Sequence, residues 1–252
     1  MSVLNDIAGG AMPGTLYGIG VGPGDPRYLT LRAAGLILSV DVVAYFAKSG
    51  RPGNARTIVA PLIQPGREEK RFEYPVTEEI PVKDARYGHS ITSFYAEMAA
   101  DLGAMLAAGK SVGLLSEGDP FFYGSFMHMW RRLKNEAAVE VVPGVTGMSG
   151  CWTRSQAPIT WGDDILTVLP GTLDEERLTQ RIRATDAAVV MKLGRNLQKV
   201  KRAVTVAGRL ADAMYVERGT MADEKVLPLS ECETGRGPYF SMIIIPGQGR
   251  RL

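Results

Sequence analysis

An apolar run at residues 111–115 is followed at once by SEGDPFFYG at residues 116–124 and then by a helical pattern. The run predicts a buried strand. The Gly-Asp-Pro sequence predicts a tight turn, because glycine accepts positive φ and proline fixes φ. In open parallel sheets, ligands bind beyond the carboxyl ends of the strands. The segment therefore predicts an α/β fold with a binding loop after this strand, with an ordinary strand-to-helix turn as the alternative.

Length and charge limit the kinds of protein that this sequence can encode. A chain of 252 residues can form one large or two small domains. Its 29 basic and 27 acidic residues give a net charge of +2, which argues against nucleic acid as the partner. No apolar run of about 18 residues and no signal-peptide pattern is present, so we expect a cytoplasmic protein without a membrane partner. Cys151 and Cys232 have no metal-ligand spacing, and we expect no metal site and no disulfide framework.

Two further strand-loop-helix units accompany the first. Residues 15–22 run into a glycine-rich loop and then into a helix capped by Thr30, and residues 139–142 run into PGVTGMSG at residues 143–150. The glycines at residues 18–24 fit neither the dinucleotide fingerprint nor the common acidic methyltransferase loop. These loops predict close approach of a bulky ligand to the backbone.

The remaining pattern predicts two domains. Apolar periodicity predicts helices near residues 30–39, 90–109, 126–134, 174–183 and 196–210, and strands near residues 15–22, 41–47, 111–115, 139–142, 164–169, 187–193, 213–217 and 239–245. The last run is expected to be a central strand, and residues 68–90 a long irregular excursion. We expect a loose leader at residues 1–14 and domains at residues 15–143 and 144–252.

Basic side chains cluster in two stretches that contain no acidic residue, at residues 48–67 and 187–211. Each stretch is either a solvated surface or a site for a polyanionic substrate.

Four segments taken together resemble the tetrapyrrole (corrin/porphyrin) methylases, and within them the precorrin-2 C20-methyltransferases. They are GIGVGPGDPRYLTLRAAG at 18–35, SEGDPFFYGSFMHM at 116–129, VVPGVTGMSG at 141–150 and VVMKLGRN at 189–196. The resemblance implies a two-domain α/β fold in which each domain is a mostly parallel or mixed sheet with flanking helices. It also implies S-adenosylmethionine bound in the cleft between the domains, and a homodimer.

The resemblance also implies site residues, position by position. The cofactor contacts would be Pro23, Gly118, Asp119, Phe122, Thr146, Gly147, Met191, Gly219 and Ser241. Two positions depart from the wider family, since Glu117 stands where glycine is common and Gly147 where alanine is common. The family's usual Met-Gly pair reads here as MKLG at residues 191–194, so the register around Met191 differs.

A precorrin carries several carboxylates around a flat apolar ring, which basic and aromatic side chains suit. The candidate substrate contacts are Arg51, Arg56, Phe121, Lys192 and Arg195. After methyl transfer to C20 a proton must leave. Glu117 and Tyr123 are the nearest candidate acceptors by position, and either could equally be a structural hydrogen-bonding group.

The resemblance implies methylation of precorrin-2 at C20, which gives precorrin-3A in cobalamin biosynthesis. The alternatives are the cobalt-containing substrate of the anaerobic branch (cobalt-factor II), another tetrapyrrole methylase, and a methylase of RNA or protein. A tetrapyrrole or nucleotide carrier without catalytic activity is a further alternative. The low net charge argues against an RNA substrate.

Overall fold

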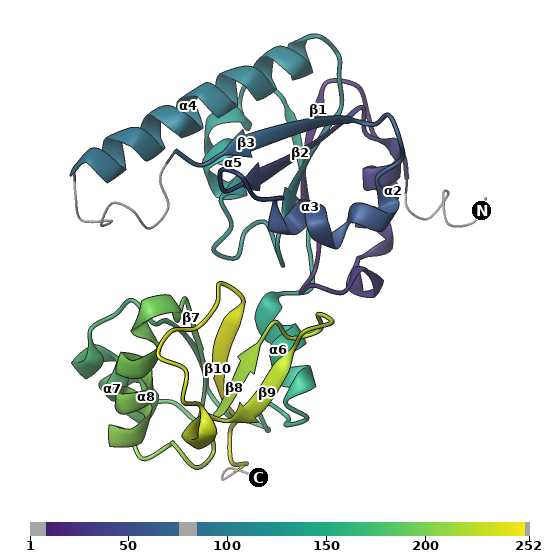
Figure 1. The fold of residues 1–252 in the computed structure, drawn as a ribbon. Coiled ribbons are helices and arrows are strands. Elements are labelled where there is room, and N and C mark those ends of the chain that lie inside the picture. Colours follow the sequence, from purple (N-terminus) through teal and green to yellow (C-terminus); the bar gives the residue numbers. More distant parts are fainter. Residues whose placement is uncertain (1–8, 76–84, 250–252) are drawn as a thin grey trace. The chain divides into compact units, whose positions relative to one another are not determined.

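The chain folds into two compact α/β units. The computed structural model describes residues 9–75 and 85–249, and its contacts divide the chain into Met1–Thr146 and Gly147–Leu252. Each unit contains one five-stranded sheet flanked by helices (Figure 1). The predicted two-domain α/β fold is confirmed. The finer limits, 15–143 and 144–252, stay a prediction, and residues 1–8 of the expected leader lie outside the described residues.

The sheet of the first unit is wholly parallel and has the order β3-β2-β4-β1-β5. Its strands are β1 (Thr15–Gly20), β2 (Val42–Ala47), β3 (Glu68–Glu73), β4 (Val112–Ser116) and β5 (Ala138–Val142). The predicted buried strand after residue 110 is β4, which lies at the centre of this sheet with every residue buried. Because all five strands run the same way, their carboxyl ends meet at one edge.

Helices cover both faces of this sheet (Figure 1). They are α2 (Leu31–Ser39), α3 (Asn54–Ile58), α4 (Ala85–Ala107) and α5 (Phe126–Leu133), with 3-10 turns at Pro26–Tyr28 and Ala60–Leu62. One core joins the sheet to α4 and α5, and the other joins it to α2 and α3. The predicted cap of α2 is confirmed, since the Thr30 hydroxyl accepts a hydrogen bond from Ala33 N–H over 3.1 Å.

The prediction of a long irregular segment at residues 68–90 is wrong at both ends. Residues 68–73 form β3, and α4 begins at Ala85. The strand has no apolar alternation to reveal it: it is an edge strand that pairs only with β2, and Phe72 is its one buried side chain. Charged side chains are common on such edges, where they oppose pairing with other chains.

The second unit has a mixed sheet in the order β6-β7-β10-β8-β9. Its strands are β6 (Leu166–Pro170), β7 (Ala187–Met191), β8 (Met214–Glu217), β9 (Lys225–Pro228) and β10 (Ser241–Ile245). The predicted central position of the last strand is confirmed, because β10 lies between β7 and β8. Helices α7 (Glu175–Arg183) and α8 (Leu197–Val206) cover one face and α6 (Gly147–Arg154) the other; 3-10 turns lie at Gly194–Asn196 and Leu229–Glu231.

Candidate active site

Three loops of the first unit meet where the central strands β1, β4 and β5 end. The backbone N–H of Val21 donates to the carbonyl of Ser116 over 2.9 Å. Gly22 and Gly118 then exchange two backbone hydrogen bonds, of 3.3 and 2.9 Å, in an isolated antiparallel bridge. The loops after β1 and β4 are therefore joined through their backbones at the edge where ligands bind in parallel sheets.

The loop after β5 enters the same contact because glycine leaves room for it. A Cβ atom on Gly20 would lie 2.6 Å from Gly144 N and 2.7 Å from Gly118 O. A Cβ atom on Gly144 would overlap the carbonyl oxygen of Gly118. Gly20, Gly118 and Gly144 thus form a cradle of bare backbone, which we call the glycine cradle.

Asp119 holds the cradle together. One oxygen of its carboxylate accepts from Phe121 N–H over 2.9 Å within its own loop, and the other accepts from Gly144 N–H over 3.1 Å. A charged acceptor strengthens such bonds. The side chain therefore ties the loop after β4 to the loop after β5.

The predicted cofactor residues of the first unit lie in the three loops that form this cradle or next to them in sequence. Pro23 follows Gly22 and is buried, and Phe122 lies partly buried in the loop after β4. Thr146 ends the unit, close in sequence to Gly144. Gly20 and Gly144 are absent from the predicted set because glycine spacing along one loop carries no signal of contact between loops.

The two candidate proton acceptors are in different surroundings. Tyr123 is 45% exposed, has φ +57°, and packs edge-on against Phe122 with ring centroids 5.0 Å apart. Positive φ is uncommon for a non-glycine residue and often marks functional loops. Glu117 is instead partly buried, and burial raises the pKa of its carboxyl group.

The basic stretch at residues 48–67 separates into two classes. Arg56 forms a bidentate pair with Glu69, with N···O distances of 2.9 and 3.0 Å. Arg67 donates to the carbonyls of Leu38 and Val40, where α2 ends. Lys48 and Arg51 are exposed and form no ion pair with any described residue. Of these four cations, only Lys48 and Arg51 can bind an anionic ligand without giving up an ion pair or hydrogen bond of the side chain to a described residue.

In the second unit, the predicted residues collect at one sheet edge. Met191 ends β7, and Ser241 begins the antiparallel β10 and pairs with Glu217 at the end of β8. Gly219 follows shortly after β8, and Gly147 begins α6, where an added Cβ atom would lie 3.2 Å from the methyl group of Met242. The same edge carries non-glycine residues with positive φ: Lys192 (+57°), Arg218 (+50°) and Thr220 (+73°). Such strain, unusual for β-branched threonine, concentrates at ligand sites.

Most basic side chains of the stretch at residues 187–211 also make hydrogen bonds or ion pairs within the fold. Lys199, Lys201 and Arg209 donate to backbone carbonyls, and Arg202 pairs with Glu175 over 2.8 Å. Lys192 and Arg195 are exposed. These two are the members of the stretch that were predicted to contact substrate.

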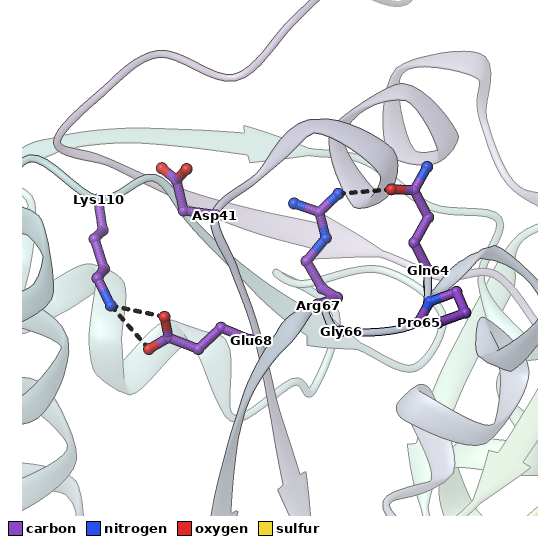
Figure 2. A pocket seen from close by; sticks show the side chains of 7 residues that line it. All are labelled: Asp41, Gln64, Pro65, Gly66, Arg67, Glu68 and Lys110. Atoms are coloured by element: carbon purple, nitrogen blue, oxygen red, sulfur yellow. Dashed lines mark hydrogen bonds and ion pairs between the residues drawn. The ribbon is translucent and has the colours of Figure 1, made fainter.

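A separate hollow of about 430 Å³ lies at the amino ends of β2, β3 and β4 (Figure 2). Its charged groups are engaged with one another and with backbone: Lys110 pairs with Glu68 over 2.7 Å, and the Asp41 carboxylate accepts from Ser111 N–H and hydroxyl. The hollow lies at the edge opposite the glycine cradle, so it is no part of the candidate site.

Residues 9–75 and 85–249 contain no helix long and apolar enough to cross a bilayer. Nor do they contain a group of three or more His, Cys, Asp or Glu side chains placed to bind a metal ion. Both Cys151 and Cys232 are buried thiols.

Comparisons with known proteins agree on one family. The family model of the Tetrapyrrole (Corrin/Porphyrin) Methylases matches residues 15–233. A precorrin-2 C(20)-methyltransferase of Sinorhizobium sp. is 50% identical over 93% of this chain and 96% of its own. A cobalt-precorrin-2 C(20)-methyltransferase of Salmonella typhimurium is 29% identical over 94% of this chain and 98% of its own. Among solved structures, a cobalt precorrin-4 methyltransferase superimposes with a TM-score of 0.70 and 25% identity, covering 92% of this chain and 95% of that one.

Proposed function

Since the chain belongs to the tetrapyrrole (corrin/porphyrin) methylases, we propose that it transfers a methyl group from S-adenosylmethionine to C20 of precorrin-2. The product would be precorrin-3A, in cobalamin biosynthesis. The observation that carries the proposal is the glycine cradle, where the loops that hold the family motifs meet through their backbones. The identity of 50% to the Sinorhizobium relative supports the choice of substrate and carbon atom.

The glycine cradle fits the cofactor. Bare backbone at Gly20, Gly118 and Gly144 lets a bulky ligand approach N–H and carbonyl groups that side chains would otherwise cover. In the proposed site the cofactor is held by the residues named from the family motifs: Pro23, Gly118, Asp119, Phe122 and Thr146 from the first unit, and Gly147, Met191, Gly219 and Ser241 from the second. When bound, the cofactor supplies an electrophilic methyl group on a sulfonium ion.

The chain's own contribution is orientation and exclusion of water. As C20 gains the methyl group, the carbon–sulfur bond of the donor breaks and the C20 proton leaves. Rigid loops that align the nucleophilic carbon with the methyl group lower the barrier without a charged catalyst. Asp119 provides this rigidity in the first unit, through its bonds to Phe121 and Gly144.

For the substrate, we propose contacts at exposed cations and aromatic rings. Arg51 of the first unit and Lys192 and Arg195 of the second would pair with ring carboxylates. Phe121 is 46% exposed and would pack against the macrocycle. Arg56 is already paired with Glu69, so its assignment to substrate is the weaker one.

For the C20 proton, Tyr123 is the proposed acceptor. Its hydroxyl group is carried on the exposed loop after β4, next to Phe122. Replacing Tyr123 with phenylalanine should lower kcat by about 100-fold, the scale of general base catalysis, and leave cofactor affinity unchanged. An unchanged kcat would exclude it.

The second candidate function is methylation of a cobalt-bearing substrate. It is favoured by the name of the Salmonella relative, at 29% identity, and disfavoured by the higher identity to the relative named for precorrin-2. Parallel assays with cobalt-free and cobalt-bearing rings separate the two, because the true substrate should have the higher kcat/KM.

The direct test is incubation of the purified protein with S-adenosylmethionine and precorrin-2. We expect a mass gain of one methyl group, placed at C20 by carbon NMR, and one equivalent of S-adenosylhomocysteine. Binding of both ligands without methyl transfer would identify a carrier and overturn the proposal. Methylation at another carbon would leave a tetrapyrrole methylase of different specificity.

Three further assignments complete the proposal, of which the first rests on the family resemblance and the other two on the sequence pattern. They are a homodimer, domain limits at residues 15–143 and 144–252, and a cytoplasmic location. Light scattering, limited proteolysis and cell fractionation test them in that order.

A further inference from the structure

The serine at the start of α5 does not cap its own helix. Ser125 is the N-cap residue, and serine at this position usually accepts from an N–H group of the first turn. Here the side chain makes no capping bond, and the backbone is helical, with φ −69° and ψ −16°. The hydroxyl group bonds instead to two other elements of the first unit.

Two tyrosines from distant elements donate to this hydroxyl group. Tyr74, directly after β3, donates to Ser125 Oγ over 2.6 Å, and Tyr95 of α4 donates to the same oxygen over 3.2 Å. The tyrosines are 51 and 30 residues away from the serine in sequence. A hydroxyl oxygen has two lone pairs and can accept both bonds. Ser125, Tyr74 and Tyr95 thus join three elements, and we call them the tyrosine clamp.

Aromatic packing holds the two tyrosine rings. The ring of Tyr74 stacks on Phe46, near the end of β2, with centroids 5.3 Å apart and planes 12° apart. The ring of Tyr95 stacks on His128 at 4.1 Å and 17°. Phe94 of α4 packs against both tyrosines, at 5.3 and 5.4 Å. Because packing already orders both rings, their hydroxyl groups can fix the position of the serine at little further cost in side-chain entropy.

The clamp holds one end of the loop after β4, and Asp119 holds the other. Between these two points the loop is tightly closed, since a Cβ atom on Gly124 would lie 2.7 Å from the carbonyl oxygen of Pro120. Tyr123 lies in this turn with φ +57°, two residues before the serine of the clamp. A non-glycine residue keeps such a conformation only where its surroundings hold it there.

We propose that Tyr74, Tyr95 and Ser125 are positioning residues: through the shared serine hydroxyl group they hold the end of the loop after β4 and so place Tyr123 at the substrate. This inference rests on the proposed function, in which Tyr123 accepts the C20 proton. A proton acceptor must lie within hydrogen-bond reach of the proton that it takes, so a loosened loop lowers turnover even when both ligands still bind.

The first test removes the hydroxyl groups and keeps the rings. We expect the double variant Tyr74→Phe/Tyr95→Phe to lower kcat about tenfold, with little change in KM for the tetrapyrrole or in Kd for S-adenosylhomocysteine. Ser125→Ala removes the shared acceptor and should match it, so one variant serves if the other fails to fold. The control is Tyr17→Phe, which removes a buried hydroxyl group that accepts from Met12 N–H over 2.7 Å and should keep kcat. An unchanged kcat in the clamp variants would overturn the inference.

A double-mutant cycle with Tyr123→Phe separates positioning from general loosening of the fold. If the clamp acts through Tyr123, removing its two tyrosine hydroxyl groups from a protein that already carries Tyr123→Phe should change kcat by no more than about twofold. The reason is that this protein has no proton acceptor left to place. The same fall in kcat in both backgrounds would mark the clamp as merely structural and overturn the inference.

Amide hydrogen exchange gives a readout that does not depend on activity. The N–H groups of Phe122 and His128, bonded to Asp119 O and Ser125 O over 3.2 and 3.1 Å, lie on either side of the serine of the clamp. Both should exchange faster in the double variant and stay slow in Tyr17→Phe. Unchanged exchange in the double variant would overturn the inference. Faster exchange, found for a protein that transfers no methyl group even without substitutions, would support the hold of the clamp on the loop and overturn the proposed function alone.

Discussion

The carboxylate of Asp119 accepts a hydrogen bond from the backbone N–H of Gly144 over 3.1 Å, although 25 residues separate the two in sequence. The same side chain closes its own loop through Phe121 N–H. One aspartate therefore holds two of the three loops of the glycine cradle, so its replacement should affect cofactor binding before it affects global stability.

We expect Asp119→Ala to raise Kd for S-adenosylhomocysteine by roughly 10- to 100-fold, because two hydrogen bonds to a charged acceptor are lost. Titration calorimetry measures the change. Asp163→Asn, at an exposed position of the second unit, is the control. Equal affinity of Asp119→Ala and the unchanged protein would show that the cofactor does not depend on this link.

Gly144→Ala should disrupt the glycine cradle sterically. Its Cβ atom would overlap Gly118 O, and backbone cannot move aside as a flexible side chain can. We expect a loss of about 1–3 kcal/mol in the free energy of unfolding, together with loss of cofactor binding. Gly88→Ala, in an exposed part of α4 with open space around it, should be neutral or slightly stabilising. Equal behaviour of the two variants in urea unfolding would contradict the close approach.

Arg51 and Arg56 should separate a binding cation from a structural one. Arg51→Gln is expected to raise KM for the tetrapyrrole about tenfold or more without changing stability, since Arg51 has no acidic partner among the described residues. Arg56→Gln breaks the pair with Glu69 and should lower stability by up to about 1 kcal/mol, with little change in KM. Steady-state kinetics and thermal melts on both variants measure these effects. A raised KM in Arg56→Gln and a loss of stability in Arg51→Gln would instead make Arg56 the binding cation and Arg51 the structural one.

Ser116 should be a position where removing a polar atom stabilises the protein. Its hydroxyl oxygen is buried and has no hydrogen-bond partner among residues 9–75 and 85–249. An unpaired buried group costs about 1–3 kcal/mol, offset in part by the small void that alanine leaves. We expect Ser116→Ala to raise the unfolding midpoint in urea. A lower midpoint would show that the hydroxyl group has a partner, such as a buried water molecule.

The pair between Glu224 and Arg154 should make stability depend on acid pH. Glu224 accepts from Arg154 Nε over 2.8 Å and from Thr220 N–H over 2.9 Å, and the hydrogen bond from Arg154 is the main cause that holds its pKa below the ordinary 4.5. A lowered folded-state pKa contributes stability that is present above 4.5 and lost as pH falls through the folded value.

Glu224→Gln should therefore lower Tm by about 2–4 °C at pH 7, and the difference should shrink as pH falls below the ordinary pKa. Scanning calorimetry across this pH range measures it. Glu233→Gln, on an exposed glutamate, is the control. A difference that is constant with pH would show that the ion pair is not its source.

The elements with strong apolar patterns were predictable from sequence, because burial on both faces selects the residues. Strands β4 and β10 are of this kind: the apolar run of β4 predicted a buried strand and that of β10 a central strand, and the structure confirms both. Strand β3 was not predictable in this way. As an edge strand with a single buried side chain, it carries no periodic signal, and its place is set by hydrogen bonds to β2.

The sequence by itself determined the family and the order of the main elements, because those features are local runs of particular residue types. Only the tertiary structure decided which charged groups are available and which are engaged. Arg51 and Arg56 are equivalent in a sequence pattern, but β3 brings Glu69 to one of them and not to the other. Contacts between segments distant in the chain leave no local sequence pattern. For that reason, which side chains are engaged in the fold can be assigned only from the tertiary structure.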